Sequence, residues 1–293
     1  MPLTDGARCA WPCDDPNRDA FVALVRDQGA RLYRDLPWRG LDDPYAVLVS
    51  EIMLQQTQVA RVGRFWERFM ALFPTIDALA SADTADVLAQ WQGLGYNRRA
   101  LALKKTADVC AAERGGMLPH TAEELQKLPG IGPATAAGVV AFAFNRPSTY
   151  LETNVRTVFL HELFPNRDGV SDKELVPLVA DTCPAEGARA WYYALLDYGA
   201  HLKTLVANPS RRSAHYTRQS TFEGSRRQKR AELVRIVLAA GAEGIGLAEL
   251  AARLDAFEEA GGRTGVETAV FESIVADLTA EGFFRREGDV FRS

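Results

Sequence analysis

The sequence contains little cysteine. Its 293 residues include only four, Cys9, Cys13, Cys110 and Cys183, which are too few and too scattered for the disulfide framework of a small secreted domain. Cys9 and Cys13 lie close together in "CAWPC", but no second pair follows at a spacing that would complete a metal site. We therefore expect reduced thiols, no bound metal and a cytoplasmic location.

Long apolar runs and a strong charge of one sign are also missing. No stretch reaches the roughly 18 consecutive apolar residues of a membrane span, and the opening "MPLTDGARCAWPCDDPNRD" lacks the apolar centre of a signal peptide. The net charge of −4 does not by itself indicate a nucleic-acid partner, although a local basic face is compatible with it. The remaining composition is typical of a soluble globular chain of two or three small lobes.

Alternating strand patterns are nearly absent between residues 18 and 205, the region that follows a tail at 1–17. Its apolar periodicity predicts consecutive amphipathic helices with short polar connections. Residues 83–94, "DTADVLAQWQGL", and 121–128, "TAEELQKL", each open with Asp or Thr followed three residues later by an acid, which is a helix-capping pattern. An all-α fold is the expectation for this region.

Two segments of different character follow. Residues 206–230 carry seven Arg or Lys, including Arg211 and Arg212, against one acid. Such a basic connector is either a solvated linker or a segment that contacts phosphates. Residues 231–293 show patterns for three helices and a hairpin, which resembles a winged-helix domain with both α and β structure. Because this domain holds twelve acids against six basic residues, a protein contact or a packing role is favoured over reading a DNA groove.

The segment "DDPYAVLVSEIMLQQTQVA", residues 42–60, predicts a helix with a carboxylate on its inner face. Asp43 can cap its amino end, and Pro44 suits the first helical position because its missing N–H is not needed there. Glu51 has an apolar residue three positions away on each side, so it lies on the stripe that packs inward. A buried carboxylate is unfavourable unless it is paired, protonated or used in chemistry, and the pattern alone leaves these three readings open.

A second segment, "LQKLPGIGPATAAGVVAFAF", predicts a tight turn between two helices. One helix is expected to end at Leu128, Gly130 and Gly132 permit the turn, and Pro133 begins the next helix. Backbone N–H groups at such a turn can cradle a phosphate. Taken alone, the pattern also fits an ordinary helical hairpin.

This hairpin resembles the helix-hairpin-helix of DNA glycosylases of the endonuclease III superfamily. "LPWRG", "DPYAVLVSEIMLQQTQV", "WQGLGYNRRA" and "LETNVRTV" are similar, in order and spacing, to segments of its MutY-like adenine glycosylase branch. The resemblance covers residues 18–205. It implies a two-lobed helical glycosylase fold with the helix-hairpin-helix at about 121–144.

The resemblance also implies a pair of catalytic carboxylates. The family's catalytic glutamate matches Glu51, which burial would keep protonated so that it can donate to a ring nitrogen of a flipped purine. The family's second carboxylate, an aspartate, matches Glu152, which is longer by one methylene, or about 1.5 Å. Glu152 would either stabilise the oxocarbenium-like sugar or activate the attacking water, and Asn154 is the neighbour that could orient either.

Further positions of the family bind DNA. The residues that match Gln55, Gln56 and Tyr96 fill the gap left by the extruded base, which partly offsets the lost stacking. Arg98 and Arg99, beside Tyr96, are expected to contact phosphates, and the hairpin glycines and the arginines of the connector extend this surface.

Two departures from the family pattern limit the expected chemistry. Relatives that also cut the DNA backbone carry a Schiff-base lysine where this chain has Ala134, and the adjacent Thr135 cannot form an imine either. The four-cysteine ligand set of the family's iron–sulfur cluster is missing, because no cysteine follows Cys183. We therefore expect a monofunctional enzyme without a cofactor.

The sequence thus predicts a DNA glycosylase of base excision repair that hydrolytically removes a base from duplex DNA carrying a mismatch or damage. Adenine opposite 8-oxoguanine or guanine is the expected substrate, although the family's domain for inspecting oxidised guanine is not recognisable in residues 231–293. The alternatives are a glycosylase for another damaged or deaminated base and a non-catalytic protein that binds damaged DNA. If the source is bacterial, we expect association with the nucleoid.

Overall fold

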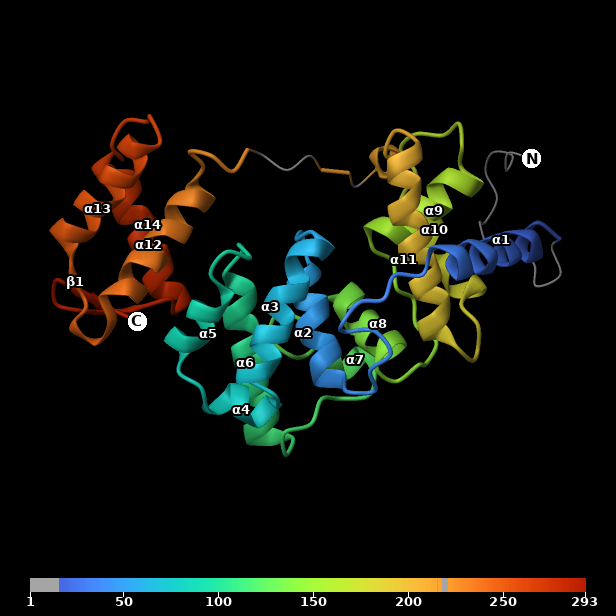
Figure 1. Ribbon diagram of the computed structural model, residues 1–293, viewed down its shortest axis with the longest axis horizontal. Helices are drawn as coiled ribbons and strands as arrows, with labels where there is room; N and C mark the ends of the chain where they lie inside the picture. The colour runs from blue at the N-terminus through green and yellow to red at the C-terminus, as the bar shows by residue number, and fades with distance from the viewer. Residues whose placement is uncertain (1–15, 215, 218–220) are drawn as a thin grey trace. The chain divides into compact units, whose positions relative to one another are not determined.

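A computed structural model describes residues 16–214, 216–217 and 221–293 (Figure 1). Helices dominate these ranges, and the strands form one small sheet near the carboxyl end, as the sequence predicts. The predictions made for Cys9 and Cys13 lie outside the described residues. No helix within these ranges has both the length and the apolar character that crossing a membrane requires.

The contacts divide the chain into two units. Unit 1 comprises Met1–Glu51 and Leu118–Arg218, and unit 2 comprises Ile52–Met117 and Gln219–Ser293. The carboxyl-terminal segment is therefore grouped with residues from the middle of the chain. The first division falls inside one helix, directly after Glu51.

Unit 1 is built around its longest helix, α11, which packs against α1, α8 and α9. Apolar residues on all sides of α11 are buried, as befits a central helix. The helices of unit 1 are α1 (Pro16–Leu32), α2 (Pro44–Leu54, whose last three residues belong to unit 2), α7 (Ala122–Leu125), α8 (Pro133–Phe142), α9 (Thr153–Leu163), α10 (Asp172–Thr182), α11 (Ala188–Leu205) and the 3₁₀ helix η1 (Pro209–Arg212).

A buried ion pair ties the "LPWRG" segment to α11. The Arg39 guanidinium donates to both carboxylate oxygens of Asp197, at 2.7 and 2.8 Å, and both side chains are almost fully buried. The Arg34 side chain bonds to the same carboxylate. Because a buried charge left without its partner is strongly destabilising, these bonds fix where the chain enters α2.

Helix α2 begins as the sequence predicts. Pro44 is its first residue, and Asp43 Oδ1 accepts a hydrogen bond from the Tyr45 backbone N–H at 2.9 Å. This cap satisfies one of the N–H groups that a helix start leaves without an internal partner.

The hairpin between α7 and α8 differs slightly from the prediction. Thr121 caps α7 by accepting from the Glu124 N–H, at 3.3 Å, but α7 ends at Leu125 rather than at Leu128. The chain continues through turns closed by hydrogen bonds between residues three apart, which do not propagate an α-helix. Gly130 has a φ of 73°, a conformation open to glycine, and Gly132 precedes Pro133 at the start of α8.

In unit 2, α6 packs against α4 and α5, and α12 packs against α13, α14 and α5. The strand order β1-β3-β2 places the last strand in the middle of an antiparallel sheet. Three helices and the β2–β3 hairpin were predicted, whereas the two-residue β1 was not. The elements of unit 2 are α3 (Val59–Leu72), α4 (Ile76–Ser81), α5 (Thr84–Trp91), α6 (Arg98–Glu113), α12 (Arg226–Ala240), η2 (Gly241–Glu243), β1 (Ile245–Gly246), α13 (Leu247–Ala260), α14 (Thr268–Glu281), β2 (Arg285–Glu287) and β3 (Val290–Arg292).

Candidate active site

The Glu51 carboxyl group lies near the end of α2, against the hairpin helix α8. Tyr150, which precedes α9, donates a hydrogen bond from its hydroxyl to Glu51 Oε2 at 3.0 Å. On the opposing helix, Gly138 leaves room for this group, because a Cβ at that position would lie 2.4 Å from Glu51 Oε2. Sequence reasoning found Glu51 but neither of these neighbours.

The pKa of Glu51 is raised to about 8, chiefly by burial and also by the nearby charge of Glu152, while the Tyr150 hydrogen bond acts in the opposite direction. The residue as a whole keeps partial solvent exposure. Its carboxyl group is nonetheless desolvated enough to be mostly protonated near neutral pH. Of the three readings left open by the sequence, protonation for use in chemistry is the one that this environment supports.

Tyr150 is itself held by two aromatic neighbours. Its ring makes edge contacts with Phe142, at a centroid distance of 5.1 Å, and with Tyr192, at 5.4 Å. The Tyr150 backbone N–H also donates to the Tyr192 hydroxyl at 3.2 Å. The hydroxyl that contacts Glu51 is therefore carried by a ring with little freedom to move.

Glu152 is the amino-terminal cap of α9. Its Oε1 accepts hydrogen bonds from the backbone N–H groups of Asn154, at 2.7 Å, and Val155, at 3.3 Å. Burial raises the pKa of Glu152 above its ordinary value, and these N–H groups and the Lys203 ammonium offset only part of that rise. A helix amino terminus favours a negative charge. The carboxylate form of Glu152 is therefore stabilised by backbone N–H donors, whereas Glu51 accepts its hydrogen bond from the Tyr150 hydroxyl.

We call Glu51, Tyr150, Glu152, Asn154 and Lys203 the carboxylate cluster. All five belong to unit 1. One carboxyl group is in an environment that favours the acid, and the other is held by donors that favour the carboxylate. This division suits glycosidic bond cleavage, in which one group delivers a proton and the other faces the positive charge of the sugar.

The predicted DNA-contacting residues Gln55, Gln56, Tyr96, Arg98 and Arg99 all lie in unit 2. Gln56 and Tyr96 have φ values of 54° and 49°. Residues other than glycine rarely adopt this left-handed conformation, and where they do it often marks a functional site. Of the three side chains named as fillers of the gap, Gln56 and Tyr96 thus stand on strained backbone, whereas Gln55 does not.

Arg99 links the segments that carry Gln56 and Tyr96 through hydrogen bonds to their backbone. Its guanidinium donates to backbone carbonyls at Ile52 and Met53, at 2.8 and 2.9 Å, and to Gly95 at 2.9 Å, and it also bonds to the Gln55 carbonyl. Because these donors are used within the protein, Arg99 orders the turns instead of reaching outward to a phosphate.

Arg98 and Tyr96 contact the carboxyl-terminal helices of the same unit. Arg98 Nε donates to Glu281 Oε2 at 2.6 Å, so a phosphate would compete with a carboxylate for this side chain. Arg227, at the start of α12, donates to the Tyr96 hydroxyl, with its guanidinium 5.4 Å from the ring centroid. The basic character of the connector was visible in the sequence, but the contact of Arg227 with Tyr96 was not.

The connector arginines Arg211 and Arg212 lie in η1. Arg212 donates to the carbonyls of Leu160 and Phe164, both at 2.9 Å, and so closes the carboxyl end of α9. Its donors are therefore engaged, whereas Arg211 is exposed. Only Arg211 of the two keeps the outward position that the phosphate prediction requires.

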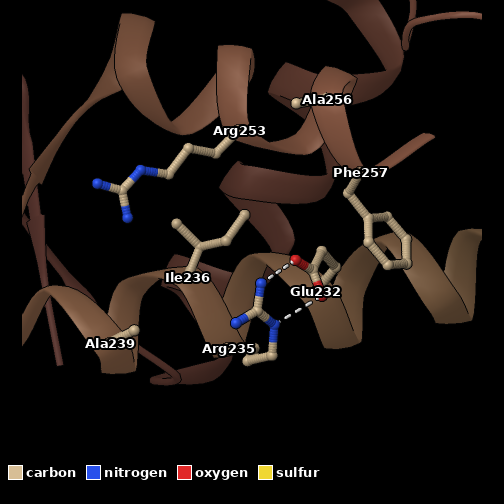
Figure 2. Close-up of a pocket in the computed structure, with 7 residues that line it drawn as sticks. All are labelled: Glu232, Arg235, Ile236, Ala239, Arg253, Ala256 and Phe257. Carbon is tan, nitrogen blue, oxygen red and sulfur yellow. Dashed lines mark hydrogen bonds and ion pairs between the residues drawn. The ribbon is translucent and has the colours of Figure 1, made fainter. Parts of the chain in front are cut away.

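A cavity of about 340 Å³ lies elsewhere, between α12 and α13 (Figure 2). In it, Arg235 Nε donates to Glu232 Oε2 at 2.9 Å. None of the predicted site residues lines this cavity, so its position does not identify the active site. Its lining consists of Glu232, Arg235, Ile236, Ala239, Arg253, Ala256 and Phe257.

The thiols offer no candidate metal centre in the part of the chain that the structure describes. Cys110 is buried and Cys183 is half-buried, and both are free. Across the same ranges, no three side chains from His, Cys, Asp and Glu gather as metal ligands.

Part of the chain is similar to known proteins. Residues 49–184 match the model of the HhH-GPD superfamily base excision DNA repair proteins. Over 177 residues, 60% of the chain, the sequence is 36% identical to an adenine DNA glycosylase of Buchnera aphidicola, and over 179 residues, 59% of the chain, it is 38% identical to one of Mycobacterium tuberculosis. The chain spans 50% and 59% of the lengths of these relatives.

The fold has a solved counterpart. The structure of a thermostable thymine-DNA glycosylase superposes with a TM-score of 0.57 at 24% identity, covering 64% of this chain and 88% of that one. At this identity the likeness establishes the fold and not the substrate. The family match is confined to residues 49–184, which are similar to the HhH-GPD superfamily of base excision DNA repair proteins.

Proposed function

We propose that this protein is a monofunctional DNA glycosylase that flips adenine out of duplex DNA and hydrolyses its glycosidic bond. The observation that carries the proposal is a pair of buried carboxyl groups: Glu51, with a pKa raised to about 8, and Glu152, whose Oε1 caps the amino end of α9. The names of the adenine DNA glycosylase relatives support adenine as the base.

In the proposed reaction, the Glu51 carboxyl transfers its proton to a ring nitrogen of the flipped adenine. The bond from the sugar C1′ to the base then breaks, its electron pair stays with the base, and adenine leaves as a neutral molecule. The sugar becomes an oxocarbenium ion, which the negative charge of Glu152 stabilises. Water adds to C1′, and the proton it loses passes to a carboxylate of the cluster.

The chemistry of Glu51 favours a purine. Protonation of a ring nitrogen turns adenine into a good leaving group, whereas many pyrimidines depart as stabilised anions without it. We propose that the adenine is mispaired with 8-oxoguanine or guanine. Contacts to the edge of the opposite base are each worth ~1–3 kcal/mol, and without a recognisable module for oxidised guanine we expect a preference of roughly tenfold or less between these two partners.

Each unit has features suited to binding DNA. In unit 1, the turn at Gly130 and Gly132 offers backbone N–H groups at the start of α8. In unit 2, Gln56 and Tyr96 are carried on turns that Arg99 orders. Side chains held in this way can fill the gap in the base stack that extrusion leaves.

Ala134 and the cysteine pattern support the absence of lyase chemistry and of an iron–sulfur cluster. Ala134 provides no amine for an imine. The segment that follows α11 supplies η1 and its arginines in place of cysteine ligands.

Single-turnover assays on matched duplexes test the function. The duplexes carry adenine opposite 8-oxoguanine, guanine or thymine, or carry hypoxanthine, uracil, thymine or an oxidised pyrimidine, and the variant Glu51→Gln serves as the control that lacks the transferable proton. We expect adenine release by the wild-type protein and a loss of ~10²–10⁴-fold in the variant, with duplex binding within a few-fold of wild type.

Three outcomes would contradict parts of this proposal. Release of a pyrimidine lesion with adenine left intact would show that the substrate is a damaged pyrimidine and not adenine. Tight binding to a lesion without any base release would identify a non-catalytic damage sensor. Normal release by Glu51→Gln would remove Glu51 from the mechanism.

A further inference from the structure

Lys203, on α11, holds the side chain of Asn154. Its Nζ donates to Asn154 Oδ1 at 2.6 Å. A lysine ammonium has only donors, so the amide atom that it contacts is the oxygen. The NH₂ group of Asn154 is therefore turned away from Lys203, and its orientation is fixed.

The close approach of α11 to α9 depends on Gly199. A Cβ on Gly199 would lie 2.2 Å from the Asn154 carbonyl oxygen, so no larger residue fits there. Gly199 and Lys203 are four positions apart and share one face of α11. Gly199 thus lies against the backbone of Asn154, and Lys203, on the same face of α11, contacts the Asn154 side chain.

Asn154 in turn contacts Glu152. The Asn154 backbone N–H makes the 2.7 Å hydrogen bond to Glu152 Oε1, the shorter of the two bonds that cap α9. Holding Asn154 therefore also holds the donor that locates the Glu152 carboxylate. Lys203 is half-buried, and burial of a charged side chain is unfavourable unless it has a partner of opposite charge or good hydrogen bonds.

We propose that Lys203 is a positioning residue that acts through Asn154, fixing the Asn154 amide and holding the Glu152 carboxylate in place. The inference rests on the proposed function, in which Glu152 faces the developing sugar cation. It assigns this task to a residue of α11, outside the segments that carry the two carboxylates.

The charges around Glu152 support this role. Lys203 faces it from α11, Glu51 faces it from α2, and Tyr150 lies just before it in the chain. Among these groups Lys203 is the cation. Burial lowers the pKa of Lys203 and raises that of Glu152, and the attraction between the two charges opposes both shifts. Removing the ammonium would leave only the backbone N–H groups at the start of α9 to oppose burial, so the neutral acid of Glu152 would be favoured further.

The first test measures the ionisation of Glu152 directly. In protein labelled with ¹³C at the glutamate carboxyl carbons, the Glu152 signal is assigned by its absence in Glu152→Gln and then titrated in wild type, Lys203→Met and Lys203→Arg. We expect Lys203→Met to raise the pKa of Glu152 and Lys203→Arg, which keeps the charge, to leave it near the wild-type value. An unchanged pKa in Lys203→Met would overturn the proposal, whether or not the protein releases adenine.

The second test separates positioning from folding and from binding. We expect Lys203→Met to slow single-turnover base release by ~10–100-fold, the range for a misplaced catalytic group, with duplex affinity retained and with the acid limb of its pH–rate profile moved to higher pH. Lys203→Arg should recover most of the rate, and Lys173→Met, an exposed lysine of α10, should match wild type. Loss of rate in both Lys203 variants with an unmoved acid limb would instead indicate a purely structural role. If wild type releases no base while the Glu152 pKa still responds, the proposed function fails and the positioning by Lys203 stands.

Discussion

The Cα of Gly138 lies against the carboxyl group of Glu51, so closely that a Cβ on Gly138 would be 2.4 Å from Glu51 Oε2 and 3.0 Å from the Tyr150 ring. Helix α8 therefore forms one wall of the space that holds the acid. The absence of a side chain at Gly138 is what lets the acid and Tyr150 share that space.

Gly138→Ala should impair base release far more than it impairs folding. The added methyl group must displace Glu51 or Tyr150, and a displacement of about 1 Å at a reacting group can reduce the rate ~10²-fold. The measurements are single-turnover release and thermal unfolding. Gly63→Ala is the matched control, because Gly63 lies in α3 with no atom within 4 Å of an added Cβ, and alanine there should stabilise the helix by up to ~1 kcal/mol. Full activity in Gly138→Ala would show that the acid tolerates a different position.

Tyr150→Phe should move the alkaline limb of the pH–rate profile to higher pH. The Tyr150 hydroxyl donates to Glu51 and so favours the carboxylate, which offsets part of the rise that burial causes and leaves the pKa at about 8. Without the hydroxyl, Glu51 stays protonated to higher pH, and release should persist further into the alkaline range. Tyr33→Phe, at an exposed tyrosine, is the control that should leave the profile unchanged. A shift toward lower pH would contradict the assigned direction of this hydrogen bond.

Glu51→Gln should be more stable than wild type in alkaline solution. In the folded protein the pKa of Glu51 is about 8, against an ordinary value of 4.5, so between these pH values the folded chain binds a proton that the unfolded chain has released. The free energy of unfolding of wild type therefore falls as the pH rises through this window. Glutamine cannot ionise, so the two proteins should differ most above about pH 8 and converge toward about pH 5 in urea unfolding. Parallel stability curves across that range would show that Glu51 is not buried as an acid.

The sequence predicts the local part of this site and not its cross-chain contacts. The cap of α2 at Asp43 and the inner face that carries Glu51 follow from helical periodicity, which nearby residues determine. The Tyr150 hydroxyl, by contrast, reaches Glu51 across 99 positions of the chain, and Lys203 reaches Asn154 across 49. Such contacts depend on how helices cross, which is set by the packing of many side chains together.

The glycines also show that the sequence predicts local structure but not contacts between distant helices. Gly130 was predicted because a tight turn needs a residue that accepts positive φ, and it has that conformation. Gly138 and Gly199 lie inside helices, where glycine is locally unfavourable, and only the neighbouring helix explains them. The strand β1 was missed for a related reason, since two residues carry no alternation, and its pairing with β3 defines it.

Purified protein should be colourless, and borohydride should trap no covalent complex with DNA. The first expectation follows from the missing cysteine ligands and the second from Ala134. Lys203, the lysine of the carboxylate cluster, donates a hydrogen bond to Asn154 Oδ1. Visible absorption from an iron–sulfur cluster would contradict the conclusion that the protein, lacking the four-cysteine ligand set, binds no cluster. A trapped adduct that disappears in Lys203→Met would assign lyase chemistry to Lys203 and show that the enzyme is not monofunctional.

Arg227→Ala should weaken binding to mismatched duplexes. Arg227 donates to the Tyr96 hydroxyl and lies over its ring, and Tyr96 is the residue proposed to fill the gap left by the flipped base. Without Arg227 the strained turn at Tyr96 loses a support, and the surface loses a cation next to the proposed path of the DNA. The test compares equilibrium binding over a range of salt concentrations and follows base extrusion with 2-aminopurine fluorescence.

Arg235→Ala provides the matched control for this prediction. Arg235 lies on the same helix, α12, but pairs with Glu232 three residues earlier and lines the cavity of Figure 2. If Arg227 contacts a phosphate, its loss should reduce the slope of log affinity against log salt by ~1, whereas Arg235→Ala should leave that slope unchanged. A lower fluorescence signal at an unchanged slope would show that Arg227 acts by supporting Tyr96. Equal effects of the two variants would mean that α12 contributes only its overall charge.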